Sequence, residues 1–380
     1  MTVDTRIHPV PLDKIAATAA EVDREARFPT ESIAALRAAG LLGIGLDATY
    51  GGPGGGPSDV VGAVESVAGA CASTGMIFTM HVVATQTLLA GTDGPDDGVK
   101  ADVLRAIAAG EHLVSLAYSE RGSRSHFWAQ VSRALPDGDG VSISADKSWV
   151  TSAGHADSYV TATGAPGSDD PTNTELYLID ARAPGIEVLG SFDGLGMRGN
   201  ASSPVAFRGV PIALERRIGG PTTGFGLMMS ATLPWFVLCS AATSVGIAGA
   251  AIATASAHVT GARFEHLGSS LADVPGVRAR LAEAKIRHMQ ARALLYQVAA
   301  EVASGGAGAQ LGVLALKAAA AEMAIDVTDQ AMRACGGAAF SRHLGLERQF
   351  RDARAASVMA PTTDVLRDLL GKALTGQELF

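Results

Sequence analysis

Residues 218–262 contain no Asp, Glu, Lys or Arg, and His258 is the one histidine among them. The middle of this run is about as long as a membrane-spanning helix, but its many Gly, Ala, Ser and Thr residues, with Pro234 near its start, are not typical of one. Small side chains let helix backbones approach each other closely. We therefore predict a helix, headed by Pro234, that is buried on all sides by other helices or by another subunit.

The hydrophobic periodicity divides the whole chain into three parts. Residues 1–115 repeat apolar side chains at three- and four-residue spacings, which predicts an N-terminal helical domain. Residues 116–224 alternate with a period of two and carry β-branched and aromatic side chains, which predicts a middle β domain. Residues 225–380 return to long, alanine-rich helical patterns. The expected fold class is therefore α+β.

Charge and cysteine content exclude several classes of protein. The chain has 30 Lys and Arg against 38 Asp and Glu, with no basic run, which argues against nucleic-acid binding. Cys71, Cys239 and Cys335 form no disulfide framework by number and no zinc pattern by spacing, so we expect no metal. The first residues lack the basic and then apolar pattern of a secretory signal, so we expect a cytoplasmic protein without a membrane anchor.

Three motifs carry the strongest functional signal. They are AYSERGSRS at 117–125, KSWVTSAGHAD at 147–157 and CGGAAFSRHLGLERQFRDAR at 335–354. They resemble the TEPxAGSD, KxWITN…AD and GGxGF…RDa segments of the acyl-CoA dehydrogenase superfamily of FAD enzymes, and the separation of the first two fits that family without a gap. The resemblance implies an N-terminal helical domain, a central β-barrel-like domain and a C-terminal four-helix bundle, assembled as a homotetramer or dimer of dimers.

The resemblance also implies a FAD site. A flavin ring needs an apolar or aromatic face and hydrogen-bonding groups at its edges. Trp149 takes the family's flavin-stacking position, Thr151 the position that meets N5, and Ser119 the position that bonds the pyrimidine edge.

Six further residues match family positions near the rest of the cofactor. Ser125 corresponds to a serine that bonds the pyrophosphate, and Gly336 and Gly337 would let backbone amides approach the pyrophosphate of a FAD held by the neighbouring subunit. Arg333 stands where the family usually has Gln, near the same diphosphate. Thr362 resembles a threonine that touches the adenosine part. For the ADP contact the candidate is Arg263, although Phe264 holds the place of the family arginine.

The usual catalytic base is missing from this pattern. Family dehydrogenases remove an acyl α-proton with a glutamate in an EGT motif, a step that needs a carboxylate facing the flavin across the substrate. Alignment on RDAR places Ala360 at that glutamate and Pro361 at the glycine. Some members carry the base in a sequence like LERL instead, and the counterpart here is LPWF, with Pro234 and Trp235. Neither usual position has a carboxylate.

Three other titratable residues are therefore candidates for proton transfer. Asp364 lies one turn beyond Ala360, but an acid there is most simply a helix N-terminal charge. His81 lies in a strongly apolar helix, where most single histidines are neutral core residues. His126 replaces the Asp of the family's GSD pattern, and a histidine near a flavin can give or take a proton near neutral pH.

Three functions remain open on the sequence. The first is a dehydrogenase or reductase that acts on an acyl thioester or a related small molecule. The second is a flavin-dependent monooxygenase or oxidase of the same fold, which needs a proton donor but no α-proton base. The third is a non-catalytic FAD-binding subunit of a mixed oligomer. A reductase or an electron-transfer flavoprotein is an expected partner.

Overall fold

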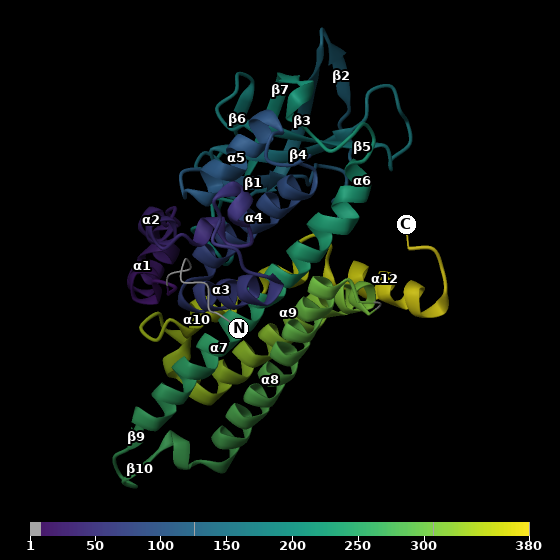
Figure 1. The fold of residues 1–380 in the computed structure, drawn as a ribbon. Helices are drawn as coiled ribbons and strands as arrows, with labels where there is room; N and C mark the ends of the chain where they lie inside the picture. Colours follow the sequence, from purple (N-terminus) through teal and green to yellow (C-terminus); the bar gives the residue numbers. More distant parts are fainter. Residues whose placement is uncertain (1–8, 125, 307, 380) are drawn as a thin grey trace.

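The computed structural model describes residues 9–124, 126–306 and 308–379, with helices at both ends of the chain and strands between them (Figure 1). The N-terminal helices are α1 (Leu12–Glu25), α2 (Thr30–Ala38), α3 (Pro57–Ala70), α4 (Ala72–Ala90) and α5 (Gly98–Ala108). Helix α4 contacts α3, α7 and the first strand, so it joins all three parts of the chain.

The middle part consists of two four-stranded sheets within the described residues. The strands are β1 (Val114–Ala117), β2 (Ala134–Asp137), β3 (Gly140–Val150), β4 (Ser158–Gly164), β5 (Thr174–Asp180), β6 (Ile186–Val188), β7 (Ser203–Ala213) and β8 (Arg217–Ile218). One sheet has the order β1-β4-β5-β8 and the other β2-β3-β7-β6. Tyr159 and Tyr177 of the first sheet share a hydrophobic core with Phe207 of the second. Bridges at Glu120–Lys147 and Arg133–Gly164 join the sheets, which gives the expected barrel-like domain.

The C-terminal part is a helical bundle. Its helices are α6 (Gly224–Leu227), α7 (Leu233–Gly261), α8 (Pro275–Ser304), α9 (Ala309–Cys335), α10 (Leu346–Asp352), α11 (Ala355–Val358) and α12 (Thr363–Thr375), and a short hairpin of β9 (Arg263–Phe264) and β10 (Ser269–Ser270) separates α7 from α8. Helix α9 packs against α7, α8 and α12. This is the four-helix arrangement that the resemblance implies.

Helix α7 occupies the centre of the molecule, between the N-terminal helices and α8 and α9 (Figure 1). The helical run from Gly224 to Gly261 is long and apolar enough to cross a membrane, but 78% of its most apolar window is buried inside the protein. Gly246 explains the close crossing with α3, because a Cβ there would lie 2.2 Å from the carbonyl oxygen of Glu65. The prediction of a buried helix is confirmed.

Pro234 is the second residue of α7, as predicted, but the helical backbone begins earlier. Helix α6 continues into a π-helical turn at Met228–Thr232 and then directly into α7. Leu233 donates its N–H to the carbonyl of Met228, five residues earlier. A π-turn adds one residue to the helical repeat, so the proline, which has no N–H to donate, is accommodated without ending the helix.

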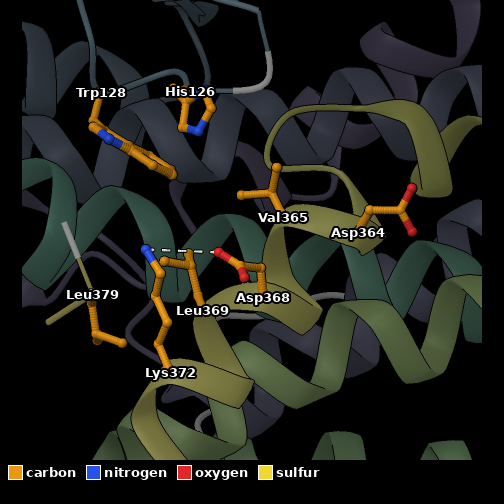
Figure 2. Close-up of a pocket in the computed structure, with 8 residues that line it drawn as sticks. All are labelled: His126, Trp128, Asp364, Val365, Asp368, Leu369, Lys372 and Leu379. Atoms are coloured by element: carbon orange, nitrogen blue, oxygen red, sulfur yellow. Dashed lines mark ion pairs between the residues drawn. The ribbon is translucent and has the colours of Figure 1, made fainter. Parts of the chain in front are cut away.

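Helix α12 brings the end of the chain back to the β domain. Thr362 caps this helix, since its hydroxyl accepts the N–H of Val365 at 3.4 Å. Figure 2 shows the first turns of α12 opposite the segment that carries His126 and Trp128. The cap leaves the Thr362 hydroxyl partly engaged within the chain, and its predicted contact with adenosine stays a prediction.

His81 is a core residue. The side chain is fully buried. Its Nδ1 accepts the N–H of Val114 at 3.2 Å, so the other ring nitrogen, Nε2, carries the proton and donates it to the carbonyl of Leu42 at 2.9 Å. Burial lowers the pKa of His81 to about 4, which keeps the ring neutral. Both nitrogens are used by the backbone, which agrees with the neutral core histidine that an apolar helix favours, and a catalytic role for His81 stays a prediction.

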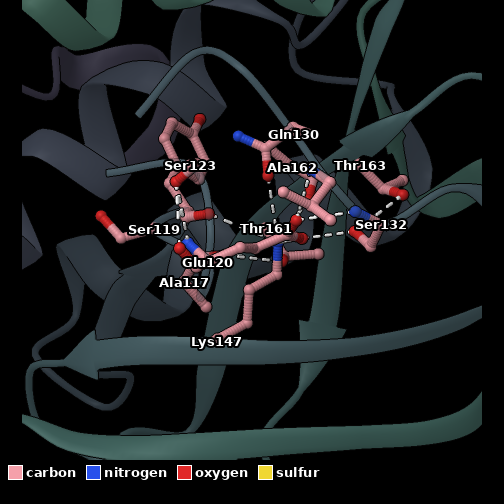
Figure 3. A network of polar contacts seen from close by, with 12 residues as sticks. Ala117, Ser119, Glu120, Ser123, Gln130, Ser132, Lys147, Thr161, Ala162 and Thr163 are labelled. Atoms are coloured by element: carbon pink, nitrogen blue, oxygen red, sulfur yellow. Dashed lines mark hydrogen bonds and ion pairs between the residues drawn. The ribbon is translucent and has the colours of Figure 1, made fainter. Parts of the chain in front are cut away.

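A buried ion pair holds the loop after β1 onto β3 (Figure 3). Lys147 belongs to the inward-facing row of β3, and its Nζ lies 2.6 Å from Glu120 Oε1 and 2.6 Å from the carbonyl of Ala162. Glu120 Oε2 accepts the N–H groups of Val131 and Ser132 at 2.6 and 2.7 Å. Burial alone would raise the pKa of Glu120, but Lys147 and the hydrogen bonds hold it below its ordinary value. Burial lowers the pKa of Lys147, and the contact with Glu120 opposes that shift. Only acceptors surround its Nζ, which is the environment of an ammonium group.

The neutral His81 predicts a specific loss of stability in acid. Its pKa is about 4 in the folded chain and about 6.5 in the unfolded chain, so the unfolded chain binds more protons between these values. This contribution is complete above pH 6.5 and is lost as the pH falls towards 4. We expect urea titrations to show roughly 2 kcal/mol less stability at pH 5 than at pH 7 from this residue. His81→Asn, which does not titrate, should lack that increment, and an equal pH dependence in both proteins would contradict the assignment.

Removing the lysine of the ion pair is expected to be costly. Lys147→Met would leave the carboxylate of Glu120 buried without its counterion, which costs roughly 3–5 kcal/mol. The double variant with Glu120→Gln should recover part of that loss. Arg208→Met is the matched control, because its partner Asp146 lies next to Lys147 on β3 but the Arg208–Asp146 pair is half-exposed, and it should cost less than about 1 kcal/mol. If Lys147→Met and Arg208→Met lowered the free energy of unfolding in urea equally, the larger effect expected for the buried pair would be refuted.

Candidate functional site

One pocket lies where the three parts of the chain meet. Its lining residues come from α4, β1 and the loop after it, β3, the start of α7 and the turn before α12: Met80, Leu116, Tyr118, Ser119, Phe127, Ser148, Trp149, Thr232, Phe236 and Ala360. The lining offers hydroxyl groups and apolar surface, and none of these ten side chains is ionised at neutral pH. Two sequence predictions, Ser119 and Trp149, and the expected base position, Ala360, come together here.

Trp149 has an unusual conformation for a tryptophan. It lies at a register shift between β3 and β7, with a left-handed φ of 58°, and 68% of its surface is exposed. Its neighbours Lys147 and Val150 are buried, which fixes the strand on both sides of the irregularity. A bulky residue in this region is strained, and such residues are concentrated at functional sites. The Phe192 ring is its one described aromatic neighbour, with the ring centroids 6.5 Å apart and the rings nearly perpendicular.

Ser119 and Thr151 differ in what they present. The carbonyl of Ser119 accepts the N–H of Ser148 at 2.8 Å, which leaves its hydroxyl at the pocket wall. Thr151 is buried, its hydroxyl lies 3.0 Å from that of Ser202, and its carbonyl accepts the hydroxyl of Ser115 at 2.7 Å. Thr151 is thus held beside the pocket but does not line it. Its predicted contact with N5 stays a prediction.

A second cavity of about 470 Å³ contains the other two predicted proton-transfer residues (Figure 2). His126 and Trp128 form one side, with their rings 5.2 Å apart and nearly perpendicular. Asp364 and other residues of α12 form the opposite side. The carboxylate of Asp364 is exposed and lies 3.7 Å from Arg367, as expected for a charge in the first turn of a helix. Neither His126 nor Asp364 lines the pocket of Ala360.

The predicted phosphate-binding residues lie at the far end of the helical bundle. Gly336 has a φ of 60° at the end of α9, and neither it nor Gly337 has another atom within 4 Å of where a Cβ would stand. The backbone is therefore open to a ligand. Arg333 is exposed and pairs with Asp329 at 2.7 Å, and Arg263 is exposed in β9, just after α7. Ser125 lies outside the described residues.

The length of α7 separates these two sets of residues. Phe236, near its start, lines the pocket, whereas Arg263 follows its end. Because α7 has 29 residues, its ends lie about 40 Å apart. One FAD molecule cannot span both sets in a single copy of the chain. If both hold the same cofactor, they belong to different copies.

Several residues of the pocket wall could not be predicted from the sequence. Tyr118 is buried, and burial raises its pKa, so its hydroxyl is neutral. That hydroxyl lies 3.4 Å from Thr232 Oγ1, which in turn lies 2.9 Å from Thr87 Oγ1. Tyr118 directly precedes Ser119 in the first motif, and this proximity was the one available signal. Nothing in the sequence marked Thr232 and Phe236 as pocket residues, because both lie in the uncharged run of residues 218–262.

Metal ligation has no support in the described part of the chain. No group of three or more His, Cys, Asp or Glu side chains there is placed to hold a metal ion. The three cysteines are buried and free.

Comparisons with known proteins agree on one family. Family models described as the N-terminal, middle and C-terminal domains of acyl-CoA dehydrogenase match residues 12–111, 115–210 and 222–375. The probable acyl-CoA dehydrogenase FadE25 of Mycobacterium tuberculosis is 29% identical over 361 residues, which cover 95% of this chain and 91% of the relative.

Two solved structures share the fold. Butyryl-CoA dehydrogenase from Megasphaera elsdenii has a TM-score of 0.90 at 23% identity and covers 97% of this chain and 96% of its own. TdsC from Paenibacillus sp. A11-2, solved with FMN and indole, has a TM-score of 0.86 at 23% identity and covers 96% of this chain and 95% of its own. The three domain matches, which follow one another along almost the entire sequence, place this chain in the acyl-CoA dehydrogenase family.

Proposed function

We propose that this chain is a FAD-dependent oxidoreductase that acts on an acyl thioester or a related small molecule without the usual glutamate base. One observation carries the proposal. The pocket at the junction of the three domains contains an exposed tryptophan and the side chain of Ala360, but its described wall has no carboxylate.

The residues present fit a flavin at the mouth of this pocket. The enclosed space is about 60 Å³, too small for a three-ring system, whereas the exposed indole of Trp149 beside it offers a flat face. Trp149 would stack on the ring, and Ser119 and Thr151 would hold its polar edge. A bound flavin supplies a centre that accepts or gives two electrons, and the chain's own residues orient it and exclude water.

The remaining contacts would come from a second copy. Gly336, Gly337, Arg333 and Arg263 lie too far along the bundle to reach a cofactor at their own chain's Trp149. A homotetramer or dimer of dimers would bring them to the diphosphate and adenosine of a neighbour's FAD. Thr362 and Ser125 are assigned to the same cofactor. Electron exchange with a reductase or an electron-transfer flavoprotein, and a cytoplasmic location, belong to the same proposal.

A second function is favoured by the composition of the pocket wall. Four of its ten residues are aromatic (Tyr118, Phe127, Trp149 and Phe236), although aromatic residues make up 5% of the chain. Such a wall suits a flat, neutral substrate. TdsC, which shares the fold, was solved with FMN and indole. A monooxygenase or oxidase reaction needs no carboxylate to remove an α-proton, so the absence of an acid at Ala360 does not oppose it.

The third function is that of a non-catalytic FAD-binding subunit. It is supported by the same alanine at the base position. A subunit that has lost its activity is no longer under selection to keep a glutamate there. Under this alternative an active homologue would supply the base in a mixed oligomer. Co-purification with a related chain, together with no reduction of the bound flavin by any substrate, would favour it over the other two.

Anaerobic titration with a panel of acyl-CoA thioesters tests the first function. Bleaching of the flavin absorbance by one of them supports it. Absence of bleaching, with consumption of oxygen by the chemically reduced protein and modification of a flat aromatic compound, would replace it with the second.

Installing the missing base gives a sharper prediction. Because Ala360 lines the pocket, Ala360→Glu places a carboxylate in its wall. General-base catalysis contributes roughly 10²–10⁴ in rate, so we expect flavin reduction by a bound acyl-CoA to become at least about 100-fold faster. Ala360→Gln, which has the same shape but cannot take the proton, is the control. No gain in a folded, flavin-loaded Glu variant would count against an acyl thioester substrate.

Trp149 gives a separate test of the cofactor site. Since its side chain is mostly exposed, Trp149→Ala should change the free energy of unfolding by less than about 0.5 kcal/mol. Loss of stacking should weaken FAD binding about tenfold or more, whereas Trp149→Phe should keep most of the affinity. Flavin fluorescence titration measures both. Unchanged affinity in the Ala variant would exclude Trp149 as the stacking residue.

A further inference from the structure

A second buried lysine lies directly behind the pocket. Lys317 is near the middle of α9, and its side chain is fully buried. Its Nζ lies 2.7 Å from the carbonyl oxygen of Ala356, 3.0 Å from that of Met359 and 2.8 Å from that of Pro361. The last two carbonyls belong to the residues on either side of Ala360. One side chain therefore holds the whole turn that carries the expected base position.

The number of contacts matches the charged form of this lysine. An ammonium group has three N–H donors, and three carbonyls surround it, whereas a neutral amine would leave one buried carbonyl without a donor. Burial acts in the opposite direction and lowers the pKa of Lys317 to about 7. No carboxylate is paired with it among the described residues, so the carbonyl dipoles take the place of a counterion.

Lys317 also touches the other wall of the pocket. Its Nζ lies 5.8 Å from the centre of the Phe236 ring, and Phe236 and Ala360 both line the pocket. The turn between α11 and α12 also packs on the hydrophobic core through Met359 and Ala360, and Met359 donates its N–H to the carbonyl of Ala355. Lys317 adds the polar contacts that hold the carbonyls of the turn against α9.

We propose that Lys317 is a positioning residue that fixes Ala360 in the wall of the pocket by donating one N–H to each of three surrounding carbonyls. The inference rests on the proposed function in one respect, because it concerns the same pocket. Lys317 does not touch the substrate or the cofactor. It acts on the backbone of the turn.

Hydrogen exchange on the full-length protein tests this role without any turnover. At pH 6, where Lys317 holds its proton, Lys317→Met should raise the exchange rate of amides in residues 356–362 by about tenfold or more. Exchange in the β domain should not change. Lys100→Met is the matched control, because Lys100 is also buried, binds Asp97 and the carbonyl of Arg217, and lies away from the pocket. It should leave the turn protected.

A kinetic measurement separates positioning from general stability. In the Ala360→Glu background, Lys317→Met should slow flavin reduction at saturating acyl-CoA by about tenfold with little change in KM, since the new carboxylate would be misplaced. Lys100→Met should alter neither value. Lys317→Arg, which keeps the charge and its donors, should restore part of the rate.

The two proposals fail in different ways. If Ala360→Glu gains no activity, the proposed function loses its support while the exchange experiment still tests Lys317. If amides 356–362 stay protected in Lys317→Met, or if Lys100→Met exposes them equally, the positioning role is overturned. Should Lys317→Met not fold, Lys317→Arg and Lys317→Gln, compared by the same exchange measurement, decide it: equal protection in both would also overturn the proposal.

Discussion

The buried contact between Glu120 and Lys147 determines where the pocket of this protein stands. Lys147 is inward-facing on one sheet, Glu120 follows the first strand of the other, and the residues beside them, Ser119 and Trp149, form the pocket wall. A buried ion pair contributes little net stability, because desolvation offsets most of the attraction. Its effect on geometry is larger. Glu120 also accepts the N–H groups of Val131 and Ser132, at the other end of the loop that follows β1. The pair therefore specifies position more than it stabilises the fold.

A second buried lysine, Lys317, lies behind the wall of the pocket that contains Ala360, and its hydrogen-bond partners differ from those of Lys147. Lys147 faces a carboxylate, whereas Lys317 faces three carbonyls and an aromatic ring. Both arrangements satisfy the donors of an ammonium group in the interior, where a lost hydrogen bond is costly. The turn with Ala360 packs its apolar side chains against the hydrophobic core, and Lys317 of α9 binds its backbone carbonyls from within the bundle.

The sequence predicted the three-part fold and the buried central helix because both depend on periodicity and composition, which are local. The motifs also predicted that Ser119 and Trp149 lie at one site.

Prediction from the sequence failed where the position of a residue depends on packing between distant segments. His81 was a candidate for proton transfer by residue type alone, but its partners, Leu42 and Val114, are set by the fold. Pro234 stands in the first turn of α7 as expected, but no composition signal marks the π-turn that joins α7 to α6 before it. The role of Lys317 could not be predicted from its alanine-rich helix, because its hydrogen-bond acceptors are backbone carbonyls about 40 residues further along the chain.

The separation between the pocket and the other candidate residues limits what one copy of the chain can do alone. The candidate acids and bases, His126 and Asp364, line a cavity beside α12, while Ala360 and Trp149 line another, so the two sets do not share one pocket. The open glycines at the end of α9 lie beyond the reach of a cofactor at Trp149 of the same chain. A cofactor held by both regions needs a second copy, but a second copy of this chain adds no carboxylate at Ala360. Whatever group takes a proton in this pocket, it is therefore not a carboxylate at position 360.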